Sequence, residues 1–180
     1  MEFEERLRAA SSILEKKLLI VGELTRRLAP QGVRPVIVGG TAVEIYSMGA
    51  YQTYDIDLVV AQREQAIRAL EAMGFQRAGR VWFHPQWEAV IEIPDTHLAG
   101  DMARLNRIEI EGYQVDCIGL EDLILDRLNA AVHWGSSEDR RWVAILLSGY
   151  RNTLDYAYLR ARAGQEGTLP MLEELLQEVR

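Results

Sequence analysis

The sequence predicts an α/β fold in which helices flank a mixed β-sheet and a helical part follows the sheet. Three observations lead to this fold. An apolar run at 34–40 has the character of a buried strand, and the segment 54–60 is typical of a second strand. Two later segments, 79–94 and 106–119, contain strand-like runs interrupted by turn residues. From residue 120 onward, apolar residues recur at helical spacing.

The helices and strands are expected in a defined order along the chain. Helical spacing predicts one long amphipathic helix over 3–29, which the Pro-Gln-Gly at 30–32 ends. A strand (34–40), a short helix (41–49), a strand (54–60) and a helix closed by Gly74 (63–75) follow. Two hairpins are expected to turn at Pro85-Gln86 and at Glu111-Gly112. Further helices are expected over 120–134, 136–147, 154–165 and 169–179, the second capped by Ser136 or Ser137.

Length, charge and cysteine content restrict the class of protein. The 180 residues are expected to form a single domain, with an α/β core over about 34–119 and a helical part over about 120–180. The net charge of −7 disfavours a grip on long nucleic acid and favours a small substrate or a protein partner. The single cysteine, Cys117, cannot form an intramolecular disulfide, and no apolar run is long enough to cross a bilayer. A cytoplasmic protein is therefore expected, with no membrane partner.

Two aspartates lie close together in the second predicted strand. Side chains alternate across a strand, so Asp55 and Asp57 point to one face while Ile56 and Leu58 point to the core. Two such charges repel each other by roughly 4 kcal/mol at ~4 Å and an effective dielectric constant of 20. A hard divalent cation offsets this repulsion, and Mg²⁺ prefers carboxylate oxygens. The pair therefore predicts a metal site.

A glycine turn comes shortly before this pair. Gly39 and Gly40 allow a tight turn from strand to helix, and the N–H groups of that helix then face an anion. The hydroxyl of Thr41 is expected to cap the helix or to bind a phosphate oxygen. An anion-binding turn beside a carboxylate pair suits phosphoryl or nucleotidyl transfer, in which charge on the phosphate must be neutralised.

These motifs, VIVGGTAVEIY followed by YDIDLVV, resemble the signature of the DNA polymerase β-type nucleotidyltransferase superfamily. Within it, the GGTA and TYDID segments are most similar to a small bacterial branch of uncharacterised or antitoxin-linked proteins. The resemblance implies a palm-like mixed sheet, Mg²⁺ or Mn²⁺, and a nucleoside triphosphate such as ATP as donor. The stretch between Gly40 and Asp55 is longer than is common in the superfamily and contains no lysine or arginine.

The resemblance also implies a third carboxylate and a basic residue. The third carboxylate comes from a later strand, and the candidates are Glu88, Glu92, Asp95 and Asp116. Glu92 is preferred because it is embedded in an apolar strand, and Asp116 is the second choice for the same reason. Arg127, on the predicted helix over 120–134, is a candidate phosphate contact, and Glu138-Asp139 match the acidic residue that related families have on the next helix. The alternative is a solvated Arg127 paired with a Glu or Asp one turn away.

The expected function is transfer of a nucleoside monophosphate from a nucleoside triphosphate to a hydroxyl acceptor by two-metal chemistry. Asp55, Asp57 and Glu92 would hold the metal ions, and Gly39, Gly40, Thr41 and Arg127 would contact the nucleotide. The acceptor stays open between a small molecule, a protein side chain and an RNA end. The alternative is a catalytically weak protein of the same fold that acts as a regulatory or antitoxin-like binding module, with a protein partner or a second copy of itself.

Overall fold

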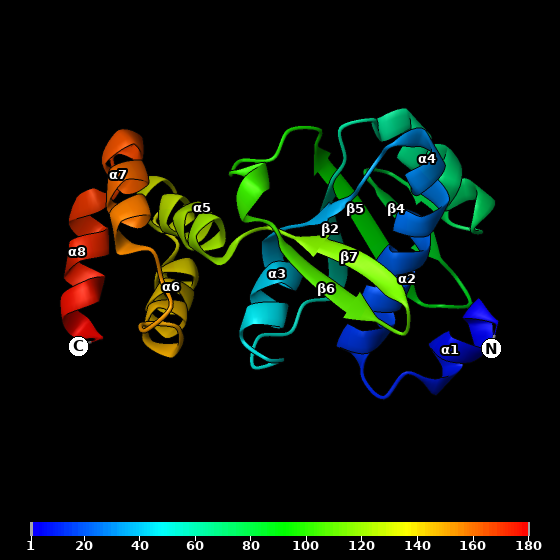
Figure 1. Ribbon diagram of the computed structural model, residues 1–180, viewed down its shortest axis with the longest axis horizontal. Helices are drawn as coiled ribbons and strands as arrows, with labels where there is room; N and C mark the ends of the chain where they lie inside the picture. Colours follow the sequence, from blue (N-terminus) through cyan, green and yellow to red (C-terminus); the bar gives the residue numbers. More distant parts are fainter. Residues whose placement is uncertain (1, 180) are drawn as a thin grey trace. The chain divides into compact units, whose positions relative to one another are not determined.

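Seven strands form one mixed sheet in the part of the chain that the computed structural model describes, residues 2–179 (Figure 1). Their order is β3-β4-β5-β2-β1-β7-β6. The strands are β1 (Val36–Ile37), β2 (Asp55–Val59), β3 (Gln76–Ala78), β4 (Val81–His84), β5 (Ala89–Asp95), β6 (Asn106–Ile110) and β7 (Tyr113–Cys117). The pairs β2–β5 and β1–β7 are parallel, and the other neighbouring pairs are antiparallel. The predicted α/β class with a mixed sheet is confirmed, as are both hairpins.

The chain divides into two compact units, which are described separately. The sheet unit contains the residues up to Leu98 together with Met102–Ile118. Its helices are α1 (Phe3–Ala9), α2 (Ile13–Leu28), α3 (Gly39–Tyr46) and α4 (Arg63–Ala72), with short 3₁₀ turns at Ala29–Gln31 and Met102–Arg104. The helical unit contains Ala99–Asp101 and the chain from Gly119 onward. Its helices are α5 (Leu120–His133), α6 (Ser137–Gly149), α7 (Tyr156–Glu166) and α8 (Leu169–Glu178).

The N-terminal segment differs from the single helix that its periodicity predicted. The chain leaves the helical conformation at Ala10, where ψ is 128°, and re-enters it at Ile13. Ser12 caps the second helix, because its side chain accepts a hydrogen bond from the backbone N–H of Glu15. The prediction of one helix over 3–29 was therefore wrong. The apolar spacing continues across the break between the two helices, although Ser12 caps the second one.

The core of the sheet unit lies between α2 and one face of the sheet. Leu19, Ile20, Val21 and Leu24 are at most 1% exposed, and α2 packs against β7 and α4. Ile56 and Leu58 of β2 are equally buried, which confirms that they point to the core. The other face of β2 is only half-buried at Asp55 and Asp57. The strand thus presents its carboxylates on the accessible face, as its alternation requires.

In the helical unit, one buried carboxylate joins three segments. Asp122 of α5 accepts hydrogen bonds from the backbone N–H of Asp101, at 2.8 Å, and from the Tyr158 hydroxyl, at 2.7 Å. These bonds explain why the short segment Ala99–Asp101 belongs to this unit. The Ser136 side chain accepts from the N–H of Asp139, so the predicted cap of α6 is confirmed. Among residues 2–179, no helix combines the length and the apolar character that crossing a membrane requires.

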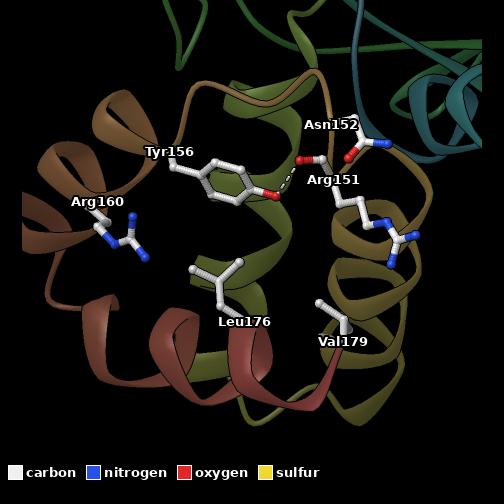
Figure 2. A pocket seen from close by; sticks show the side chains of 6 residues that line it. All are labelled: Arg151, Asn152, Tyr156, Arg160, Leu176 and Val179. Atoms are coloured by element: carbon white, nitrogen blue, oxygen red, sulfur yellow. Dashed lines mark hydrogen bonds between the residues drawn. The ribbon is translucent and has the colours of Figure 1, made fainter.

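A pocket of about 310 Å³ also lies in the helical unit (Figure 2). The ring of Tyr156 lies across it, and the Tyr156 hydroxyl donates to the backbone oxygen of Arg151 at 2.7 Å. Leu176 of α8 forms part of its apolar wall. The guanidinium of Arg160 is held beside this pocket by Glu173, at 2.6 Å. The Arg160–Glu173 ion pair therefore joins α7 to α8, and the Tyr156 hydroxyl joins α7 to the segment that precedes it.

Candidate active site

Three carboxylates meet on the accessible face of β2 and β5. Asp57 is the direct partner of Glu92 in the parallel pairing of these strands, and Asp55 stands two residues earlier in β2. Asp55, Asp57 and Glu92 each bring one carboxylate oxygen within 4.8 Å of the others. All three side chains are half-buried. The structure therefore brings together the two aspartates and the glutamate that the sequence singled out.

The second choice for the third carboxylate lies elsewhere in the sheet. Asp116 is on β7, two strands away from β2, and is 1% exposed. Its oxygens accept from Nε of Arg34, at 2.7 Å, and from Nε of Arg107, at 2.8 Å. Burial acts to raise the pKa of Asp116, but the hydrogen bonds from Arg107 and Arg34 outweigh it and hold the pKa below its ordinary value. Asp116 is thus a buried ion-paired carboxylate rather than a neighbour of the three.

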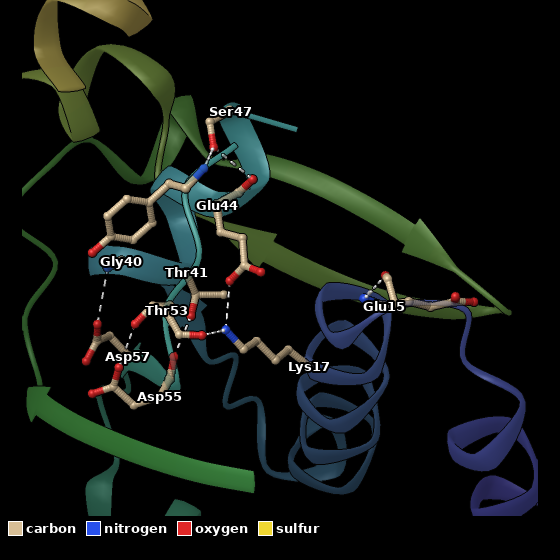
Figure 3. A network of polar contacts seen from close by, with 11 residues as sticks. Glu15, Lys17, Gly40, Thr41, Glu44, Ser47, Thr53, Asp55 and Asp57 are labelled. Carbon is tan, nitrogen blue, oxygen red and sulfur yellow. Dashed lines mark hydrogen bonds and ion pairs between the residues drawn. The ribbon is translucent and has the colours of Figure 1, made fainter. Parts of the chain in front are cut away.

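The glycine turn lies directly against one of these carboxylates. The helix α3 begins at Gly39, immediately after Val38, and Gly39 has φ of +58°, which favours glycine. A β-carbon at position 39 would overlap Oδ2 of Asp57 and would lie 2.9 Å from its Cγ. The backbone N–H of Gly40 donates to the same Oδ2 at 3.3 Å (Figure 3). Only a residue without a side chain allows the turn to approach the carboxylate this closely.

The hydroxyl of Thr41 does not point to an anion site. Thr41 is fully buried, and its Oγ1 donates to the backbone oxygen of Asp55 at 2.8 Å (Figure 3). The helix α3 has no side-chain cap at its N-terminus. The expectation that this hydroxyl caps the helix was therefore wrong, because it donates to a backbone oxygen of strand β2 instead. Thr41 fastens the start of α3 to the start of β2.

Two further residues hold Asp55 in place and were missed as site residues in the sequence. Thr53 donates through Oγ1 to Oδ1 of Asp55 at 2.8 Å. The ammonium of Lys17, on α2, donates to the backbone oxygen of Thr53 at 2.6 Å and to Oε2 of Glu44 at 2.7 Å (Figure 3). Lys17 stands 36 residues before Thr53, and its neighbour Lys16 has the same residue type. No local pattern distinguishes the buried lysine from its half-buried neighbour.

We expect Lys17→Met to destabilise the sheet unit by about 3–5 kcal/mol, because it leaves Glu44 buried without its cation. The side chains of Lys17 and Glu44 are only 4% and 5% exposed. Urea unfolding monitored by circular dichroism would measure the loss. Lys16→Met is the matched control, because Lys16 is half-buried, and we expect it to change the free energy of unfolding by less than about 1 kcal/mol. Equal losses in the two variants would show that the buried Lys17–Glu44 ion pair makes no specific contribution to the free energy of unfolding.

The remaining predicted residue, Arg127, lies on α5 in the helical unit. Its Nη2 is 2.5 Å from Oδ2 of Asp126, and its Nη1 is 3.2 Å from Oδ1 of Asp139 on α6. An ion pair with an acidic residue one turn away was the alternative expected for Arg127; the pair seen with Asp139 instead joins α5 to α6. A role for Arg127 in nucleotide binding stays a prediction.

A glycine turn at the start of a helix, beside three carboxylates on a mixed sheet, is the arrangement expected of a nucleotidyltransferase. The model for the family "Nucleotidyltransferase of unknown function (DUF6036)" matches residues 16–178, and the chain belongs to this family. The resemblance to the polymerase β-type superfamily is thereby confirmed. No curated protein matches the chain.

Two solved structures share the fold. One is an antigenic nucleotidyltransferase-like protein from Paracoccidioides brasiliensis, 16% identical, with a TM-score of 0.59 over 93% of this chain and 94% of that one. The other is ANT(2")-Ia in complex with adenylyl-2"-tobramycin, 15% identical, with a TM-score of 0.53 over 81% of this chain and 98% of that one. At these identities the likeness concerns the fold alone.

Proposed function

We propose that this protein transfers a nucleoside monophosphate from a nucleoside triphosphate to a hydroxyl acceptor, with release of pyrophosphate. The observation that carries the proposal is the group of three carboxylates, with oxygens within 4.8 Å of one another, beside the glycine turn. The family to which the chain belongs supports the reaction type. The structural neighbour solved with an adenylylated antibiotic supports ATP as the donor and a hydroxyl compound as the acceptor.

The donor atoms at this site fit a hard divalent cation. Asp55, Asp57 and Glu92 offer only carboxylate oxygens, which suit Mg²⁺ or Mn²⁺ and do not favour softer metals. A bound Mg²⁺ would neutralise the charge that develops on the transferred phosphate and would favour ionisation of the acceptor hydroxyl. The two aspartates, close to the turn, would hold the metal ion next to the triphosphate. Glu92, on the neighbouring strand, completes the ligand set or takes the proton of the acceptor hydroxyl.

The triphosphate would be held by backbone groups rather than by cationic side chains. The first N–H groups of a helix have no partner within the helix, and the helix dipole adds positive potential there. In α3 these groups belong to Gly39, Gly40 and Thr41, and the N–H of Gly40 also donates to Oδ2 of Asp57 at 3.3 Å. The Thr41 contribution is its N–H, because its hydroxyl donates to Asp55. This arrangement accounts for a phosphate-binding turn that contains no lysine or arginine.

Calorimetric titration of the protein with each nucleoside triphosphate, with and without Mg²⁺, tests the proposal. We expect binding of at least one triphosphate that requires the metal ion and is abolished by a chelator. Incubation with labelled triphosphates and cell extract would then identify the acceptor by the label it receives. A wild-type protein that binds no triphosphate in the presence of Mg²⁺ or Mn²⁺ would rule out the enzyme and favour the regulatory, non-catalytic alternative.

A further inference from the structure

The accessible face of the sheet continues from the three carboxylates onto β4. Val81 pairs with Glu92, and Phe83 pairs with Val90, so these four side chains share one face. On that face Val81, Phe83 and Val90 are half-buried. On the opposite face of the same strands, Trp82 and Ile91 are buried in the core. An apolar surface with one aromatic ring therefore adjoins Glu92.

The hairpin formed by β3 and β4 carries a local positive charge. No acidic residue occurs between Ala72 and Trp87, whereas the whole chain has a net charge of −7. Two arginines of this hairpin lie in different environments. Arg77 extends over the ring of Trp82, with its Cζ 6.0 Å from the ring centroid. Arg80 stands at the turn, with its side chain 91% exposed and its Nε 4.0 Å from Oε1 of Glu92.

The sheet order separates Arg80 from the glycine turn. The turn lies where β1 leads into α3, on one side of the β2–β5 pair, and Arg80 precedes β4 on the other side. Neighbouring strands are about 4.8 Å apart, so three strand spacings place β1 and β4 about 14 Å from each other. In nucleotidyl transfer the attacking and leaving oxygens lie on opposite sides of the phosphorus. If pyrophosphate leaves beside the glycine turn, then the acceptor hydroxyl arrives from the side of Glu92 and Arg80.

We propose that the acceptor is an anionic hydroxyl compound, and that Arg80 binds its phosphate or carboxylate group. Val81 and Phe83 contact the apolar part of the acceptor, and its hydroxyl reaches Glu92. This inference rests on the proposed function, because it assigns the second substrate of the same site. It distinguishes the protein from an enzyme that acts on a neutral or cationic acceptor.

The charges explain why Arg80 is suited to this role. Because the Arg80 side chain is almost fully exposed and its Nε is 4.0 Å from Glu92, this ion pair contributes little to stability, and the guanidinium can bind another anion. When divalent cations are bound by Glu92 and the aspartates, they repel the nearby guanidinium. A phosphate or carboxylate on the acceptor relieves this repulsion and accepts two parallel hydrogen bonds from the arginine.

Three small hydroxyl compounds of similar size test the proposal: glycerol 3-phosphate, glycerate and glycerol. The full-length protein is first saturated with Mg²⁺ and a non-transferable ATP analogue, and binding of each compound is then followed by NMR, including the side-chain Nε–H signals of arginine. We expect at least one of the two anionic compounds to bind roughly tenfold or more tightly than glycerol, which corresponds to one charge-assisted contact. The preferred anion, phosphate or carboxylate, identifies the group that the acceptor carries.

The variants Arg80→Gln and Arg77→Gln remove the same charge from the same hairpin. We expect Arg80→Gln to abolish the preference for the anionic compound while binding of the ATP analogue stays within about threefold of wild type. Arg77→Gln should keep the preference, since Arg77 lies over Trp82. Equal binding of the three compounds by the loaded wild type, or no binding of any, overturns the role of Arg80. Failure of the wild type to bind the analogue of any nucleoside triphosphate in the presence of Mg²⁺ overturns the proposed function itself, and the acceptor assignment with it.

Discussion

Replacement of Asp57 by asparagine is expected to reduce nucleotidyl transfer by roughly a thousandfold or more. Asparagine keeps the size of the side chain but removes the negative charge that would hold the metal ion and balance its neighbours. Asp57 is the carboxylate that both pairs with Glu92 across the strands and accepts the N–H of Gly40. It therefore connects the proposed metal ligands to the glycine turn. Initial rates with labelled triphosphate, and calorimetric titration with Mg²⁺ and ATP, would measure the two losses.

Matched variants separate loss of the site from loss of the fold. Glu92→Gln should behave like Asp57→Asn, whereas Glu109→Gln, the same chemical change on the exposed strand β6, should keep wild-type activity. Asp116→Asn should lower the free energy of unfolding, because it weakens the ion pairs to Arg34 and Arg107, and should leave the rate per folded molecule unchanged. The assignment of Glu92 is wrong if Glu92→Gln transfers nucleotide at the wild-type rate and Asp116→Asn does not.

Gly39→Ala is expected to lower activity by about a hundredfold, because displacement of a reacting group by about 1 Å has effects of this size. The added β-carbon overlaps Oδ2 of Asp57, so either the carboxylate or the turn must move. A positive φ also disfavours alanine, by roughly 1–2 kcal/mol. The substitution thus combines a general effect on stability with a specific effect on the site.

Gly49 provides the control for this experiment, since it follows the same helix and has φ of +82°. A β-carbon at Gly49 would meet no atom within 4 Å. Gly49→Ala should therefore lower the free energy of unfolding by a similar amount, about 1–2 kcal/mol, and leave transfer unaffected. Thermal unfolding and initial rates are to be measured for both variants. Equal activity of the two would mean that the contact between the turn and Asp57 is not needed for transfer.

The parts of the fold that depend on local alternation could be predicted from the sequence. Ile56 and Leu58 fall on the buried face and Asp55 and Asp57 on the accessible one because side chains alternate in any strand. Strand β3 was missed, because all three of its residues are exposed and show no alternation. The break before Ile13 was missed because the apolar spacing of the two helices is continuous.

The choice between two carboxylates depended on strand order, which local sequence does not determine. Glu92 and Asp116 both lie in strands with apolar neighbours, and only the pairing of β5 with β2 brings one of them beside Asp57. The same holds for Lys17 and Arg80, whose partners lie far along the chain or across a hairpin. In the sequence alone, neither Lys17 nor Arg80 differs from other charged residues, because their partners become neighbours only in the folded chain.

The burial of α2 determines which fragment of this protein can fold by itself. The sequence motif begins near Arg34, and a fragment chosen from the motif alone would start there. Such a fragment would lack the apolar side chains of α2 that fill the core and the ammonium of Lys17 that holds Thr53. A folding fragment must therefore include the whole of α2 with its capping residue Ser12, and recombinant versions of the sheet unit should retain this helix.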